Sequence, residues 1–129
     1  MITLSLLQFL EDNGFGTVDK NLFWQKLSLG KQGIYIVDIG QPQDRSERRT
    51  QRYEIFSRGK SDVDGYEKLQ SIVEFLNNSY STCYLPKAKV YSKSRSYDNV
   101  SIMPVSTPTN IGEDSNGRII WSANGELKY

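Results

Sequence analysis

Hydrophobic side chains recur with helical spacing in two segments of the chain. In the first segment the spacing is i, i+4, i+7 and i+8, at Ile2, Leu6, Phe9 and Leu10. This pattern predicts an amphipathic helix at the N-terminal end of the sequence. Gly14 follows it and indicates where the helix ends, because glycine readily adopts the left-handed conformation that closes a helix.

The second helical segment opens with a capping signature. Ser61 and Asp64 form an S-x-x-D capping box. The apolar stripe behind it consists of Tyr66, Leu69, Ile72, Val73 and Leu76. The stripe ends near Asn77, so we expect a helix over about 61–78. Gly65 in its first turn weakens it by about 1 kcal/mol relative to alanine.

Six other segments have the composition or the alternation of strands. They are residues 21–27, 34–40, 51–59, 84–91, 99–107 and 117–124. In 51–59 the apolar positions alternate, and the natural partner of this strand is 34–40, a segment apolar enough to be buried on both faces. Residues 41–50 then form a polar connection. Pro86 and Pro104 place their strands at a sheet edge or a bulge.

The predicted order is α-β-β-β-α-β-β-β. It indicates an α+β fold in which two helices pack on one antiparallel or mixed sheet. The length of 129 residues fits a single domain spanning 1–129. No apolar run is long enough to cross a bilayer, and the N-terminal segment lacks the features of a signal peptide. We therefore expect no membrane partner.

The amino-acid composition limits the kinds of catalytic and metal-binding site that the chain can form. The chain has no histidine, which excludes histidine-based acid–base, nucleophilic and metal-binding sites. Cys83 is the single cysteine, so no disulfide can form within the chain. Glu113 and Asp114, near Asp98, form an acidic pair in a turn-rich segment, where solvated loop charges are the usual explanation. We predict no enzyme activity, no metal site and no cofactor.

Positive charge is concentrated in two places, although the chain as a whole carries only +1. The stretch 41–60, "QPQDRSERRTQRYEIFSRGK", holds three acidic residues and the six basic residues Arg45, Arg48, Arg49, Arg52, Arg58 and Lys60. Such a stretch suits a nucleic-acid arm, a protein-binding loop or a solvated connection between strands. The two signs of charge within it favour protein contacts over a free nucleic-acid arm.

The second basic group is interleaved with aromatic residues. It comprises Lys87, Lys89, Lys93 and Arg95, with Tyr80, Tyr84, Tyr91 and Tyr97 around them. Cations among aromatic rings can contact phosphates and stack on bases. Aromatic residues and arginine are equally favoured at protein interfaces, and strand tyrosines also simply cover sheets. All three readings remain open for this group.

The last third of the chain, "MPVSTPTNIGEDSNGRIIWSAN", resembles the C-terminal segment of the tail terminator proteins of long-tailed bacteriophages, also called minor capsid or tail-completion proteins. The likeness is carried by Pro108, by 111–114 and by 116–118, ahead of an amphipathic final strand. The N-terminal helix ending in "GFGT", the strand pair within 22–40 and the segment "RYEIFSRGKSDVDGYEKLQSIVEFLNN" follow in the same order. The connection at 41–52 is more heavily charged than is typical of the family, and the polar region at 92–99 is longer.

The resemblance implies a structural virion protein that is assembled in the host cytoplasm and has no catalytic activity. Such proteins form a ring, commonly a hexamer, on the head-proximal end of the tail tube. The ring stops tail polymerisation and offers its other face to the head–tail connector protein. Contact with the passing DNA would be weak and non-specific.

Within this interpretation, two sets of residues are candidates for contacts. Candidates for the subunit or partner interface are Arg45, Arg48, Arg49, Arg52, Glu113 and Asp114. Candidates for a lumen or DNA-facing surface are Lys87, Lys89, Lys93 and Arg95. The alternatives are a head-to-tail connector of the phage neck and, from another class, a small α+β nucleic-acid-binding module.

Overall fold

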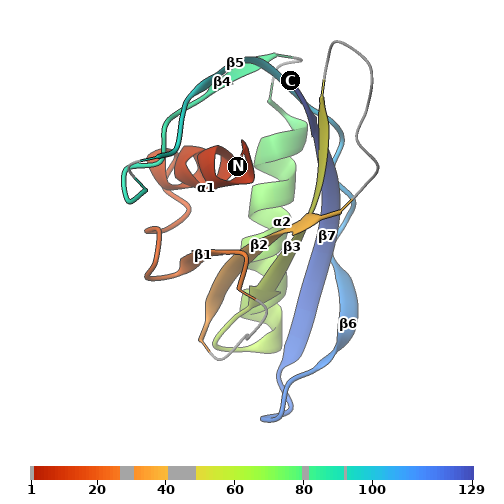
Figure 1. The fold of residues 1–129 in the computed structure, drawn as a ribbon. Helices are drawn as coiled ribbons and strands as arrows, with labels where there is room; N and C mark the ends of the chain where they lie inside the picture. The colour runs from red at the N-terminus through yellow and green to blue at the C-terminus, as the bar shows by residue number, and fades with distance from the viewer. Residues whose placement is uncertain (1, 27–30, 41–48, 80–81, 92) are drawn as a thin grey trace.

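A computed structural model describes residues 2–26, 31–40, 49–79, 82–91 and 93–129. Within these residues the chain forms two helices and seven strands (Figure 1). Their bounds are α1 Ile2–Asp12, β1 Leu22–Trp24, β2 Gly33–Ile39, β3 Thr50–Arg58, α2 Asp62–Asn77, β4 Cys83–Leu85, β5 Tyr97–Ile102, β6 Thr109–Glu113 and β7 Ile119–Lys128.

The strands form one mixed, curled sheet in the order β1-β2-β3-β7-β5-β4, with β6 paired to β7 beside this path. β1 runs parallel to β2, and the other pairs are antiparallel. The predicted pairing of 34–40 with 51–59 is confirmed, with Ile36 opposite Ile55. The predicted α+β class, two helices on a mixed sheet, is therefore confirmed.

The predicted order of elements was wrong in the C-terminal third, where four strands follow α2 instead of three. β6 was not predicted, and the strand expected at 84–91 is reduced to β4. β4 is an edge strand with an irregular register, as expected beside Pro86. The expectation for Pro104 was wrong, because β5 ends at Ile102 and has a neighbour on each side.

Helix α1 is buried on every side from Ile2 to Gln8, although its sequence predicts an amphipathic helix. Its polar residues Thr3, Ser5 and Gln8 are as inaccessible as its leucines. The cause is the curl of the sheet: β4 and β5 form an arm that passes over α1, while β1 and β2 lie on its other side (Figure 1). The apolar positions of α1 join the main core of the domain.

Helix α2 packs along β3 and β7 on the same face of the sheet as α1. The predicted capping box is present, because Ser61 caps the helix and its Oγ accepts the backbone N–H of Asp64 at 3.1 Å. Gly65 also has a structural reason: a Cβ there would lie 3.0 Å from the backbone nitrogen of Gly59. The first turn of α2 therefore approaches the end of β3 backbone to backbone.

The opposite face of β2, β3 and β7 carries no helix among the described residues. Phe23 and Tyr35 stack there with ring centroids 4.8 Å apart. A shallow groove on this side has a volume of about 530 Å³ and is lined by residues that include Ile39, Arg52 and Met103. None of the helices in the described ranges is long and apolar enough to cross a membrane.

Candidate functional site

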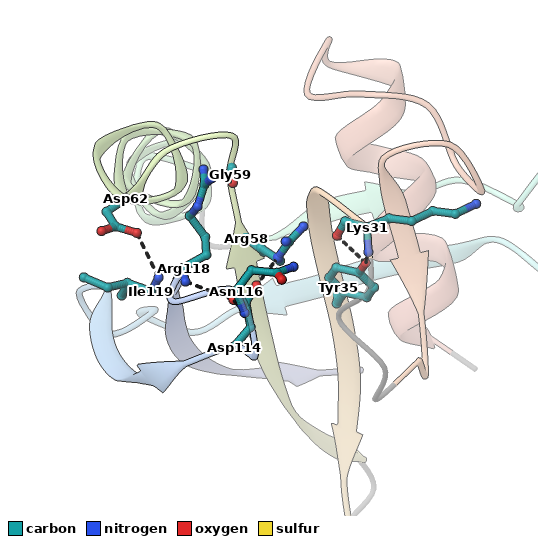
Figure 2. A network of polar contacts seen from close by, with 9 residues as sticks. All are labelled: Lys31, Tyr35, Arg58, Gly59, Asp62, Asp114, Asn116, Arg118 and Ile119. Atoms are coloured by element: carbon teal, nitrogen blue, oxygen red, sulfur yellow. Dashed lines mark hydrogen bonds and ion pairs between the residues drawn. The ribbon is translucent and has the colours of Figure 1, made fainter.

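An ion pair joins two segments that are far apart in the sequence (Figure 2). Arg58, the last residue of β3, donates a hydrogen bond through Nε to the carboxylate of Asp114, which follows β6. The two side chains are only 12% and 13% exposed. The pair is therefore well shielded, unlike a typical surface ion pair.

The same carboxylate organises the turn between β6 and β7. Oδ1 of Asp114 accepts the backbone N–H groups of Asn116 at 2.8 Å and Arg118 at 2.9 Å. Gly117 completes the turn with φ of 76°, a left-handed conformation that favours glycine. The hydrogen bond from Arg58, followed by that from the backbone of Arg118, lowers the pKa of Asp114. The carboxylate is therefore ionised at neutral pH.

The start of β7 is fastened to the start of α2 (Figure 2). Asp62 accepts the backbone N–H of Ile119 at 2.8 Å, and Arg118 donates through Nη1 to the carbonyl of Gly59 at 3.2 Å. Nε1 of Trp121 donates to the Asp62 carbonyl at 2.9 Å. These contacts fix the position of the β6–β7 turn relative to the end of β3 and the first turn of α2.

A second polar feature, which we call the cationic loop, comprises residues 86–91 and 93–96 between β4 and β5. Two buried side chains of α1 hold it from beneath. The hydroxyl of Ser5 donates to the carbonyl of Arg95 at 2.8 Å, and Oε1 of Gln8 accepts the backbone N–H of Lys89 at 3.0 Å. Within the loop, buried Ser94 donates to the carbonyl of Ala88 at 3.0 Å. The polar side of α1 therefore sets the loop's backbone.

The charged ends of the loop's side chains face outward. Lys87, Lys89, Lys93 and Arg95 are all exposed. Nζ of Lys89 lies 3.7 Å from the Asp12 carboxylate, and the Arg95 guanidinium lies 4.7 Å from the ring centroid of Tyr97. The described part of the loop thus presents a group of exposed cations on a backbone that hydrogen bonds to Ser5 and Gln8 hold.

The other candidate residues lie at two ends of β3. Arg45 and Arg48 fall outside the described residues. Arg49 is exposed, and Arg52 lies 3.4 Å from the Glu126 carboxylate. Arg49 precedes β3 and Arg52 is the third residue of this strand. Glu113 is exposed near the other end of β3, beside the turn that Arg58, the last residue of the strand, contacts. Among the described residues, Arg49 and Arg52 make no ion pair with Glu113 or Asp114, and Asp114 is already bound by Arg58.

The polar network around Arg58, Asp62 and Asp114 has a structural role. Its charged groups bind backbone groups or one another, so they hold segments in place. Among the described residues no three Asp, Glu, Cys or His side chains gather as metal ligands would. Burial raises the pKa of the Cys83 thiol. Exposed features available to a partner include the cationic loop and the surface around the β6–β7 turn.

Sequence reasoning missed the roles of Ser5, Gln8 and Asp62. The signal for the first two was present, because both interrupt an otherwise apolar run at the start of the chain. For Asp62, position in the first turn of a helix explains an acidic residue without any partner in β7. Compared with protein-family models and with curated protein sequences, the chain matches none of them. The functional argument therefore depends on the residues and their geometry.

Proposed function

We propose that the protein is a tail terminator, or tail-completion, protein of a long-tailed bacteriophage. In this proposal it forms a ring, expected to be a hexamer, on the head-proximal end of the tail tube. The ring stops tail polymerisation and provides the surface to which the head connector joins. Its role is structural, without a cofactor, and its place is in the virion after assembly in the host cytoplasm.

One observation carries the proposal. Two of the segments that carry the resemblance to the family are 52–78 and 103–124. In the fold they meet in one network, through Arg58 with Asp114 and through Asp62 with Ile119. Residues that define the likeness in sequence thus support one another in space. This is what we expect if the motifs encode a rigid scaffold and not a reactive centre.

The strand edges are compatible with a closed assembly. β1 and β4 have three residues each. The pairing of β6 with β7 is irregular between Asn110 and Glu113, and Pro108 precedes β6. Short, bulged edges discourage open-ended strand pairing between molecules. Contacts between side-chain surfaces, repeated around a closed ring, satisfy a heterologous interface without forming filaments.

A second candidate is supported by the cationic loop. Four exposed cations close together in one loop suit a nucleic-acid-binding module. The net charge of +1 weighs against a dedicated binder, which normally has a marked basic excess. A neck connector within the same virion would use the same surfaces as the terminator and is the alternative within phage assembly.

The test is electron microscopy of tails assembled with and without the protein. We expect overlong tails that fail to join heads in its absence, and tails of uniform length after the purified protein is added. Uniform tails that form without the protein but fail to join heads would favour the neck connector. Uniform tails that also join heads without it would contradict a role in capping.

A further inference from the structure

Helix α2 presents a stripe of exposed acidic and apolar side chains, which we call the acidic stripe. Its members, spaced to share one face of the helix, are Val63, Tyr66, Glu67 and Glu74. Val63 is 66% exposed and Tyr66 is 38% exposed, large values for side chains of this type. Tyr66 is held against Trp121 with ring centroids 5.1 Å apart, so the stripe has a fixed aromatic member.

The charge of this helix is strongly one-sided. α2 contains four carboxylates and one cation, Lys68. Lys68 is engaged by Asp64, with Nζ 3.3 Å from the carboxylate, and Asp62 accepts a hydrogen bond from β7. Glu67 and Glu74 are therefore the carboxylates that the helix presents on the stripe. A surface of this kind favours a partner with both cationic and apolar side chains.

The cationic loop offers that combination. Residues 86–96 contain four cations and no acidic residue. Val90 in the loop is 51% exposed, and Tyr84 in neighbouring β4 is 56% exposed. Exposed aliphatic and aromatic groups among cations are typical of a surface that binds protein. A phosphate backbone would leave the exposed valine without an apolar contact. The loop and the acidic stripe therefore complement each other in charge and in apolar content.

Among the described residues, no ion pair joins the two surfaces within one chain. The cationic loop is the tip of the β4–β5 arm and lies beside α1, whereas α2, which carries the stripe, begins at the other end of the molecule, near β6 (Figure 1). Two complementary surfaces on different sides of a molecule make a heterologous contact, in which each copy binds the next by a different face. Such a contact repeats around a ring.

We infer that the cationic loop of one copy docks on the acidic stripe of α2 in the next copy. The contact pairs Lys87 and Lys93 with Glu67 and Glu74, and brings Val90 against Val63 and Tyr66. This inference rests on the proposed ring and specifies which surfaces form it. It assigns the cationic loop to a second copy of this chain, with DNA as the competing ligand.

The experiment is a charge swap in the full-length protein. One variant carries Lys87→Glu and Lys93→Glu, a second carries Glu67→Lys and Glu74→Lys, and a third carries all four changes. These positions are exposed, so each variant is expected to fold normally, which circular dichroism and thermal unfolding verify. The matched control is Lys26→Glu with Lys31→Glu, two exposed lysines within the connection between β1 and β2.

Sedimentation velocity and native mass spectrometry then measure self-association, alone and with DNA added at low salt. We expect each double variant to associate at least about ten-fold more weakly, and the control to behave like the wild type, because like charges oppose one another at the interface. The variant with all four substitutions should associate like the wild type again, because the charges are exchanged on both surfaces. An equimolar mixture of the two double variants should form mixed oligomers.

The outcomes separate the inference from the proposed function. A wild-type ring that neither double variant weakens would overturn the docking inference and leave the ring standing. If the double variants associate weakly and the variant with all four substitutions does so too, the docking inference is also overturned. The same holds if the variant with Lys87→Glu and Lys93→Glu loses only DNA binding. A wild-type protein that never associates would overturn the inference and the proposed ring together.

Discussion

Replacing Gln8 with leucine tests whether α1 holds the cationic loop in place. Gln8 is 1% exposed and lies in the middle of the helix. Its Oε1 accepts the backbone N–H of Lys89, and its Nε2 donates to Glu11 at 2.6 Å and to Asp12 at 2.9 Å. Leucine has a similar volume and favours helices, so the substitution removes the hydrogen bonds with little change in packing or propensity.

The expected cost follows from these three contacts. The Lys89 N–H is left without its acceptor near a buried helix, at a cost of about 1–3 kcal/mol. The carboxylates of Glu11 and Asp12 are at least partly exposed and can bind water in place of the Gln8 amide. The loss of these two hydrogen bonds therefore adds only about 1 kcal/mol. The total of about 2–4 kcal/mol corresponds to a decrease in Tm of roughly 10 °C for a domain of this size.

Two assays separate stability from loop order. Urea unfolding measures the loss of free energy. Limited trypsin digestion under native conditions measures access to the peptide bonds after Lys87, Lys89, Lys93 and Arg95, and we expect cleavage there to accelerate more than cleavage elsewhere. The matched control is Gln70→Leu on α2, where the amide donates to Glu74. Because the Oε1 of Gln70 is buried without a hydrogen-bond partner among the described residues, this substitution should not lower stability and should leave cleavage in the loop unchanged.

The reasoning would be refuted by a Gln8→Leu variant that is as stable as the wild type and no more sensitive to trypsin in the loop. That result would mean that the loop's backbone is held by its own contacts, such as that of Ser94 with Ala88.

Three further predictions address the buried core and the ion pair at the β6–β7 turn. The Tyr53 hydroxyl is buried without a hydrogen-bond partner among the described residues, so Tyr53→Phe should raise stability by about 1 kcal/mol in thermal unfolding, and a loss would reveal a partner. A Cβ on Gly125 would lie 2.5 Å from that hydroxyl oxygen. Gly125→Ala should therefore cost at least about 1–3 kcal/mol in urea unfolding, while Gly40→Ala, where no atom is near, should cost little. Because Arg58 lowers the pKa of Asp114 in the fold, this group contributes stability above its unfolded pKa, near 4, and that contribution is lost as the pH falls through its lower folded pKa. Asp114→Asn should reduce this acid-dependent loss in unfolding curves measured between pH 2 and 7, and an unchanged pH profile would contradict the role assigned to the pair.

Much of the N-terminal two thirds could be predicted from local pattern. The capping box at Ser61 and Asp64 lies within four residues of sequence, so it needs no tertiary information. The pairing of β2 with β3 follows from two adjacent apolar segments and a polar connection. By contrast, nothing local indicates that β1 runs parallel to β2, because alternation gives a strand's faces but not its direction relative to a neighbour.

The errors in the C-terminal third have a common cause. β6 has an irregular register and five exposed residues, so it lacks the alternation that marks a half-buried strand. The turn at 114–118 was recognisable as a turn, but its bonds to Arg58 and Asp62 are long-range. The same holds for the cationic loop, whose charges are evident in the sequence while its support by Ser5 and Gln8 appears only in the fold.

The central claim is that the protein works as a closed ring. Native mass spectrometry of the wild-type protein, across a concentration series and after incubation with purified tail tubes, tests this directly. The account predicts one defined oligomer, expected to be a hexamer, free in solution or bound to tube ends. A protein that stays monomeric at high concentration and does not bind tail tubes would contradict the account.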